Sequence, residues 1–219
     1  MNGITLNESK PVRKLQDLKV LGYHIKDHMI GPDRSRLQPL LEMPNPVNLK
    51  DLKRMRGLFA YYAKWINDFS TKIKPLSEAT SFPLSKEAVQ SIAILKENLG
   101  SVTLMAINET LPFTVETDAS NVAISATLNQ KGKPVAFFSR TLSTNQRKYP
   151  AIEKEALAVV EAFKHWSHLL LGRRFTLITD QRSVAFMFDA RKHSKIKNAK
   201  IMNWRLDLAP FHFDTSYRP

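Results

Sequence analysis

Residues 113–120, FTVETDAS, form an apolar, β-branched run that ends in a carboxylate, Asp118. Residues 175–183, FTLITDQRS, repeat this pattern, and Asp180 follows the second run at the same point. Alternating apolar and β-branched residues bounded by turn-forming residues are typical of β-strands. If the two strands are neighbours in one sheet, the aspartates at their ends are adjacent, and this possibility organises the interpretation of the rest of the chain.

A third carboxylate is predicted on a helix between the two strands. Residues 149–160, YPAIEKEALAVV, place Glu155 within an apolar run, where an inward-facing acid is possible, although Glu153 is a competing candidate. Clustered carboxylates repel one another unless a cation neutralises them, and hard oxygen ligands select Mg²⁺ or Mn²⁺. The alternative is that each acid caps a helix or faces solvent, and spacing alone does not separate the two interpretations.

Composition limits the possible functions. The 219 residues contain no cysteine, which excludes disulfides and thiolate zinc sites, and six histidines that form no obvious ligand cluster. The net charge of +13 favours a polyanionic partner, with nucleic acid as the leading candidate. No apolar run approaches the roughly 20 residues of a membrane span, and the N-terminus lacks the apolar core of a signal peptide. We therefore expect an intracellular protein, cytoplasmic or nuclear, that does not enter a membrane.

The first half of the chain has mainly helical patterning. Its expected elements are a hairpin at residues 18–30, a helix from Asp33 to Leu41, a helix at 49–67 capped by Asn48, and a helix at 85–99 ending at Gly100. Val89 is among the residues expected to face the core. An aromatic group could stack on bases, but helical spacing favours a core role; it consists of Phe59, Tyr61, Tyr62, Trp65 and Phe69.

The second half predicts an α/β layout, with a boundary near residues 100–111. Three strands at 113–116, 122–129 and 135–139 are expected to form an antiparallel meander. Ser143 or Thr144 can start the next helix, although Pro150 suggests that it begins properly there. It is expected to reach about Leu171, and the strand at 175–179 follows. Two further helices, at 182–189 and 196–209, precede a last strand at 210–217.

Several of these segments in fixed order resemble a known family. FTVETDAS, KPVAFFSRTLS, YPAIEKEALAVV, LLGRRFTLITDQRS and FHFDTSYRP are similar to the ribonuclease H domain of gypsy-type (Ty3-like) retrotransposon reverse transcriptases. LGYHI and MPNPVNLKDLKRMRGLFAYYAKWINDFSTKIKPL resemble the thumb and connection region that precedes it. The resemblance implies a small, mainly helical thumb/connection module at residues 1–110 and, at 111–219, an α/β ribonuclease H-like domain with a mixed sheet and flanking helices.

The resemblance also implies an activity: metal-dependent endonucleolytic cleavage of RNA in RNA·DNA hybrids, with two Mg²⁺ or Mn²⁺ ions. It assigns Asp118, Glu155 and Asp180 as three of four acidic metal ligands and selects Glu155 over Glu153. In the family, the fourth aspartate lies on a final helix after a segment beginning YRPG, whereas this sequence ends at Pro219. The expectation is a domain without that helix and with impaired hydrolysis; the alternative is a non-catalytic remnant that binds nucleic acid or supports a polymerase.

The polymerase centre is expected to lie elsewhere in the parent polyprotein. The sequence contains no Asp-Asp pair, and the resemblance implies that the fingers and most of the palm lie upstream. We therefore expect no DNA synthesis by this chain alone.

Nucleic-acid contacts are predicted at three places. Ser120 and Asn121, next to Asp118, could meet the 2′-hydroxyls that distinguish RNA from DNA. A lone loop histidine, His193, could shuttle a proton but is more often simply exposed. Two basic groups could contact phosphates, although a charge run is usually a solvated face. They are Arg191, Lys192, Lys195, Lys197 and Lys200 in the second half, and Lys50, Lys53, Arg54 and Arg56 on the expected thumb helix.

Overall fold

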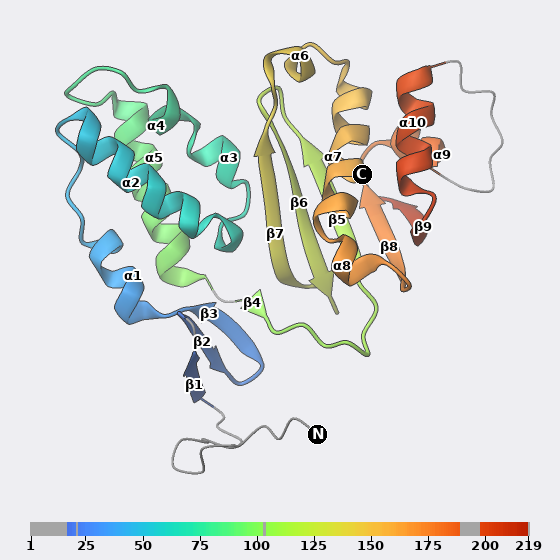
Figure 1. Cartoon of the computed structure of the whole chain (residues 1–219), viewed down its shortest axis with the longest axis horizontal. Coiled ribbons are helices and arrows are strands. Elements are labelled where there is room, and N and C mark those ends of the chain that lie inside the picture. Colours follow the sequence, from blue (N-terminus) through green and yellow to red (C-terminus); the bar gives the residue numbers. More distant parts are fainter. Residues whose placement is uncertain (1–16, 21, 103, 189–197, 219) are drawn as a thin grey trace, which may run out of the picture.

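The computed structural model describes residues 17–20, 22–102, 104–188 and 198–218, and it contains two hydrophobic cores. The first core belongs to an N-terminal module, residues 17–105, and the second to a C-terminal α/β unit, residues 113–218. Figure 1 shows the module as a group of helices above a small sheet, beside the larger sheet of the α/β unit.

The N-terminal module combines short helices with a small antiparallel sheet of order β1-β2-β3-β4. The predicted hairpin at residues 18–30 is confirmed and extended by two more strands. The strands are β1 (Asp17–Val20), β2 (Tyr23–Lys26), β3 (Met29–Pro32) and β4 (Leu104–Met105). The helices are α1 (Arg34–Leu41), α2 (Leu49–Tyr61), the 3₁₀ turn η1 (Ala63–Trp65), α3 (Phe69–Lys72), α4 (Lys74–Glu78) and α5 (Lys86–Ser101).

The helix starts of the module follow from side-chain capping. The side chain of Asp33 accepts a hydrogen bond from the amide of Ser35, and that of Asn48 accepts one from the amide of Asp51. Each bond satisfies a backbone donor that has no partner within the helix. The predicted starts of α1 and α2 are therefore confirmed.

The predicted helix at residues 49–67 is wrong in its second part. The α-helix ends at Tyr61, a 3₁₀ turn follows, and Asp68 adopts a left-handed conformation with φ of 52° before α3 begins. Trp65 still enters the core, but the bend lets η1 and α3 pack against a strand of the α/β unit. Tertiary packing has overridden the helical pattern.

Two details of α5 also differ from the prediction. The helix continues through Gly100 to Ser101, and its C-cap is Val102 rather than the glycine. Leu99 is fully buried. Its packing on the core stabilises the last turn of α5, which therefore continues past Gly100. Val89, expected in the core, is exposed.

The aromatic group is mainly structural, as predicted. Phe59, Tyr62 and Trp65 are buried, and Phe69 packs against the same core. Tyr61 is the exception, with 63% of its surface exposed. Four of the five rings therefore cannot stack freely on nucleobases.

The α/β unit contains a five-stranded mixed sheet of order β7-β6-β5-β8-β9. The strands are β5 (Thr114–Ala119), β6 (Ala123–Gln130), β7 (Lys133–Thr141), β8 (Arg174–Thr179) and β9 (His212–Tyr217). The meander β5-β6-β7 is antiparallel, as predicted, while β8 pairs in parallel with both β5 and β9. The helices are α6 (Thr144–Arg147), α7 (Ala151–His165), α8 (Ser167–Leu170), α9 (Arg182–Phe188) and α10 (Ala199–Leu208).

Local sequence explains the ends of these elements. Lys131 and Gly132 both have positive φ, which suits the tight turn between β6 and β7. Both predicted helix starts exist, because Ser143 caps α6 and Pro150 precedes α7. The helix expected to reach Leu171 is interrupted at Trp166, whose buried ring turns into the core.

Packing of α7 against the sheet forms the core of the α/β unit. Helices α7, α8 and α10 lie on one face of the sheet in Figure 1. Phe163 of α7 is fully buried and makes ring contacts with Phe175, Phe211 and Phe213. This packing fixes α7 over the sheet, and so fixes which residues of α7 can reach the ends of the strands.

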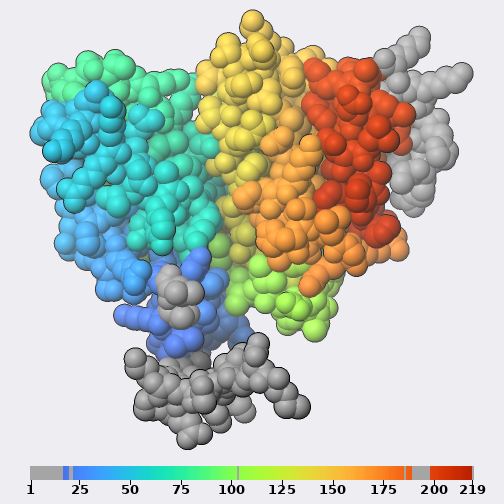
Figure 2. Space-filling model, in the orientation of Figure 1, coloured from blue at the N-terminus to red at the C-terminus, as the bar shows by residue number. Residues whose placement is uncertain are grey.

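The N-terminal module lies against the β7 edge of the sheet. In the space-filling view, its blue-to-cyan surface meets the yellow surface of the α/β unit over much of the height of the molecule (Figure 2). Among the residues described, no helix is long and apolar enough to span a membrane.

Candidate metal centre

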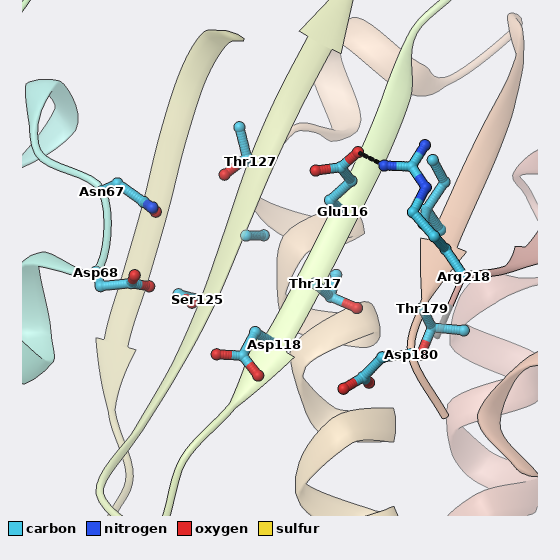
Figure 3. Close-up of a pocket in the computed structure, with 12 residues that line it drawn as sticks. Asn67, Asp68, Glu116, Thr117, Asp118, Ser125, Thr127, Thr179, Asp180 and Arg218 are labelled. Carbon is cyan, nitrogen blue, oxygen red and sulfur yellow. Dashed lines mark hydrogen bonds and ion pairs between the residues drawn. The ribbon is translucent and has the colours of Figure 1, made fainter. Parts of the chain in front are cut away.

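The parallel pairing of β5 with β8 brings two aspartates together. Val115 pairs with Leu177 and Glu116 with Ile178, so continuation of this register places Asp118 beside Asp180. Figure 3 shows the two side chains next to each other at the ends of their strands. Both side chains are exposed, as a binding site for an external ligand requires.

Glu155 reaches the same place from α7. Its side chain is buried, with 6% of the residue surface exposed, and it feels the charges of both Asp118 and Asp180. Glu153, the competing candidate, instead contacts Lys200 and Asn198 of α10 and its N-cap. The structure therefore brings Asp118, Glu155 and Asp180 together and directs Glu153 away from them.

The electrostatics of the carboxylate cluster disfavour three negative charges. Burial raises the pKa of Glu155 to about 8, and the charges of Asp118 and Asp180 add to the rise, while the backbone amide of Ala119 opposes it. Desolvation by neighbouring groups also raises the pKa of Asp118, although part of this residue still meets solvent; the backbone amide of Ala119 opposes the rise, and the charges of Asp68 and Asp180 add to it. Without a cation, Glu155 is thus mainly protonated at neutral pH.

Two buried oxygens at the cluster lack hydrogen-bond partners. They are Oε2 of Glu155 and Oγ1 of Thr117, which precedes Asp118 in β5. Leaving such atoms unpaired costs free energy, so Oε2 is available to a ligand from outside the chain. An oxygen-only set with an unpaired buried carboxylate oxygen fits a hard divalent cation.

The present side-chain positions do not yet form a complete coordination shell. Within the described part of the chain, no group of three or more histidine, aspartate or glutamate side chains is arranged to hold a metal ion. Asp118 and Asp180 are exposed, whereas Glu155 is buried. Binding of an ion by these three carboxylates would therefore require their side chains to rearrange.

A polar pocket of about 360 Å³ opens beside Asp118 and Asp180 on the sheet face opposite α7. Its wall includes Asn67 and Asp68 from the N-terminal module, on the far side of Ser125 in Figure 3. At its other side Arg218 donates a hydrogen bond of 3.2 Å to Glu116. The pocket is thus formed jointly by the two parts of the chain.

The turn after β5 contains the two residues predicted to meet RNA. The hydroxyl of Ser120 donates to the carbonyl of Ala123 and accepts from the amides of Val122 and Ala123. Asn121 is exposed, and its Oδ1 accepts a hydrogen bond of 2.9 Å from the ammonium of Lys154. Ser120 is therefore occupied within the turn, whereas Asn121 faces outward.

The predicted basic contacts have different outcomes. On α2, Lys50, Lys53 and Arg54 are exposed and Arg56 is half-buried. Lys200 forms an ion pair with Glu153 and lies over the ring of Tyr149, so it already has partners. The remaining predicted positions, Arg191, Lys192, His193, Lys195 and Lys197, lie outside the described residues.

Two residues near the cluster were not anticipated from the sequence. Lys154 shares a helix face with Leu157 and Ala158, so helical spacing was a usable signal of its burial. Asp68 has no such signal, because it reaches Asp118 only through the packing of the N-terminal module against the sheet.

Comparison with known proteins agrees with this architecture. Residues 108–211 match the family model of the RNase H-like domain found in reverse transcriptase. The retrovirus-related Pol polyprotein from transposon opus of Drosophila melanogaster is 31% identical over 223 residues, which cover 92% of this chain and 22% of that protein. The Pol polyprotein of transposon 297 from the same organism is 30% identical over 208 residues, covering 92% of this chain and 19% of that protein.

A third relative is the transposon Tf2-3 polyprotein of Schizosaccharomyces pombe, 28% identical over 228 residues, covering 99% of this chain and 17% of the polyprotein. The chain thus spans only about a fifth of the length of these relatives.

Solved structures show the same fold. The foamy viral protease-reverse transcriptase in complex with an RNA/DNA hybrid matches with a TM-score of 0.73 and 21% identity, over 93% of this chain and 29% of that one. A foamy viral protease-reverse transcriptase dRH in complex with double-stranded DNA has the same TM-score at 20% identity, over 92% of this chain and 38% of that one.

The mixed sheet, the family match over residues 108–211 and the relatives that align along most of the chain lead to one conclusion. Residues 108–211 contain an RNase H-like domain of the kind found in reverse transcriptase, and the chain is similar along most of its length to a segment of the Pol polyproteins of Ty3/gypsy-type retrotransposons.

Proposed function

We propose that this chain cleaves the RNA strand of RNA·DNA hybrids with the help of divalent metal. The observation that supports this most directly is the carboxylate cluster itself. Asp118, Glu155 and Asp180 come from β5, α7 and the end of β8, and burial with mutual repulsion raises the pKa of Glu155 to about 8. A cluster that resists full ionisation is stabilised by a cation, as a metal-dependent hydrolase requires.

In this proposal, the three carboxylates would hold Mg²⁺ or Mn²⁺. The chemistry that the metal supplies when bound is activation of a water molecule and stabilisation of the departing 3′ oxygen. Glu155 must lose its proton for binding, and its unpaired Oε2 is the atom available as a ligand. Asp118 and Asp180 are exposed beside the pocket and define where the scissile phosphate would lie.

Positive charge supports binding of the duplex. The net charge is +13, and Lys50, Lys53 and Arg54 are exposed on α2. Among structural neighbours, one foamy viral enzyme was solved with an RNA/DNA hybrid, which is the substrate class we propose here. We also propose that the polymerase palm and fingers belong to the parent polyprotein, since the chain spans about a fifth of its relatives.

The two hydrophobic cores support a division of the chain into two domains, which we propose at residues 1–110 and 111–219. Limited proteolysis followed by mass spectrometry tests it. We expect the first persistent fragments to be separated near residue 110, and early cleavage inside β5–β7 or α2–α5 would contradict the division.

A cleavage assay tests the proposed activity. We expect a labelled RNA strand annealed to DNA to be cut in the presence of Mg²⁺ or Mn²⁺ and to remain intact with EDTA. Asp118→Asn and Glu155→Gln should abolish cutting, whereas Glu153→Gln, which changes a neighbouring acid bound to Lys200, should retain it. Cleavage by the Asp118→Asn variant at the unaltered rate would disprove the assignment of the site.

The second candidate is a nucleic-acid-binding module without catalysis, which the strong positive charge favours. It predicts salt-dependent binding of the hybrid with no RNA cleavage at any metal concentration. Salt dependence alone does not separate the two functions, because both require phosphate contacts. The cleavage assay does separate them.

A further inference from the structure

Lys154 is an unusual residue because its charged side chain is buried within the α/β unit. It lies on α7 directly before Glu155, and 7% of its surface is exposed. Burial of an ammonium group costs free energy unless its charge and donors find partners. Its hydrogen bond to Oδ1 of Asn121, at 2.9 Å, joins residues 33 positions apart in the sequence.

The bond determines which way the amide of Asn121 faces. An ammonium group only donates, so the carbonyl oxygen of Asn121 must point to Lys154 and the amide nitrogen must point elsewhere. An Asn121 amide flipped by 180° would place Nδ2 against the ammonium group, and two donors cannot form this hydrogen bond. The Nδ2 group carries the two remaining hydrogen-bond donors of a residue that is exposed as a whole.

The backbone around Asn121 is also held in place. The amide of Ser120 donates to the carbonyl of Ala123 at 2.8 Å, and the Ser120 hydroxyl makes three further bonds across the turn. Hydrogen bonds within the turn hold its backbone, and the hydrogen bond to Lys154 of α7 holds the side chain of Asn121. The direction of Nδ2 is therefore preorganised. Preorganised donors lose little entropy when they meet a ligand.

Asn121 lies three residues after Asp118, at the same end of β5. A duplex whose scissile phosphate is at Asp118 would bring a neighbouring ribose within reach of this turn. The 2′-hydroxyl oxygen of RNA accepts a hydrogen bond from an amide N–H, and DNA has no equivalent acceptor there. The outward donor thus suits discrimination between the two sugars.

We propose that Lys154 is a positioning residue that holds Asn121 so that its amide group selects the RNA strand through a 2′-hydroxyl. This inference rests on the proposed function for its substrate. Lys154 itself contacts no substrate and acts only through Asn121. In this proposal, Asp118, Glu155 and Asp180 act in cleavage, whereas Lys154 and Asn121 act in recognition of the sugar.

Binding to two matched duplexes tests the proposal without any need for cleavage. Affinities for an RNA·DNA hybrid and for a DNA duplex of the same sequence are measured by fluorescence anisotropy in EDTA, and their ratio is the selectivity. We expect Lys154→Met to lower the selectivity by about tenfold, which corresponds to the loss of one hydrogen bond. Lys133→Met, which removes an exposed lysine at the start of β7, should weaken both duplexes equally and keep the ratio.

A double-mutant cycle identifies the path of the effect. If Lys154 acts through Asn121, Asn121→Ala should lower the selectivity as much as Lys154→Met, and the double variant should lose no more than either. Additive losses, or full selectivity in Lys154→Met, would overturn the proposal. A wild-type protein that binds both duplexes equally would overturn it too, even if the cleavage assay supports the proposed function.

Asn121→Asp separates positioning from stability. The new carboxylate keeps an acceptor for Lys154 and adds opposite charge, so the melting temperature should be maintained or raised. The outward N–H donors are removed, so selectivity should still fall by about tenfold. Unchanged selectivity in Asn121→Asp would refute the role of the amide, and with it the proposal, even if Lys154→Met fails to fold.

Discussion

The backbone amide of Ser70, in α3, donates a hydrogen bond of 2.9 Å to Oγ of Ser139 in β7. The Ser139 hydroxyl in turn donates to Oγ of Ser70 at 3.1 Å. These residues are 69 positions apart and join the N-terminal module to the α/β unit. Because Asn67 and Asp68 directly precede α3, the contact also holds them at the wall of the pocket beside Asp118.

Ser139→Ala should destabilise the protein. The buried Ser70 would lose the partner of its amide, which costs about 1–3 kcal/mol. For a chain of this size, each kcal/mol lowers the melting temperature by about 2–4 °C. Differential scanning fluorimetry measures the change, and Ser101→Ala, at an exposed helix end, is the control. Equal melting temperatures of both variants would show that the contact does not stabilise the junction.

Glu155 should make stability depend on pH in the absence of metal. Its folded pKa of about 8 lies above the ordinary value of 4.5, so the folded state binds more protons between these values and stability falls as pH rises through this window. Glu155→Gln should remove this decline, worth on the order of a few kcal/mol at pH 8. Urea unfolding at pH 5 and pH 8 measures it.

Two controls accompany the pH experiment. Glu153→Gln should leave the decline in place, and Mg²⁺ should raise stability at pH 8 only when Glu155 and Asp118 are both present. A wild-type protein equally stable at pH 5 and pH 8 would contradict the raised pKa of Glu155.

Asp68→Asn should lower the pKa of Asp118. The charge of Asp68 is one of the causes that raise this pKa, and asparagine keeps a similar shape. Asparagine also tolerates the left-handed conformation of residue 68, so the backbone should be unaffected. Carbon-13 NMR titration of the Asp118 carboxyl group measures the shift. As a control, Glu97→Gln on helix α5 should leave the pKa of Asp118 unchanged. An unchanged pKa of Asp118 in Asp68→Asn would contradict the packing of the N-terminal module against the sheet.

Exposed basic residues of α2 should contribute affinity without selectivity. Replacing Lys50, Lys53 and Arg54 together with glutamine should weaken hybrid and DNA duplex by the same factor. The salt slope of binding should fall by about 1 for each phosphate that these side chains no longer neutralise. Titrations at several salt concentrations test this. An unchanged slope would mean that α2 faces solvent rather than the duplex.

Much of the α/β unit could be predicted because its signals are local. The alternation in residues 113–119, the turn at Lys131-Gly132 and Pro150 before α7 each act within a few residues, and all three appear in the structure. The proximity of Asp118 and Asp180 was also predictable, given adjacent strands. Spacing did not decide between Glu155 and Glu153 as the third carboxylate, and only the resemblance to the family selected Glu155. In the structure, the packing of α7 places Glu155 near Asp118 and Asp180 and Glu153 beside Lys200.

The wrong predictions share a physical cause. The end of α2 at Tyr61 and the continuation of α5 through Gly100 each depend on packing against a partner distant in sequence. A helical pattern of apolar residues predicts which side of a helix is buried. It does not predict which other element packs against that side.

The sequence by itself determined two strands with Asp118 and Asp180 at their ends and, between them, a helix that carries Glu153 and Glu155, because periodicity and capping act over a few residues. Only the tertiary structure decided that Lys154 donates a hydrogen bond to Asn121 and that Asp68 lies close enough to influence Asp118. The first contact requires α7 to lie on the sheet, and the second requires the N-terminal module to pack against β7. Both depend on the burial of apolar surface between elements that are distant in the sequence.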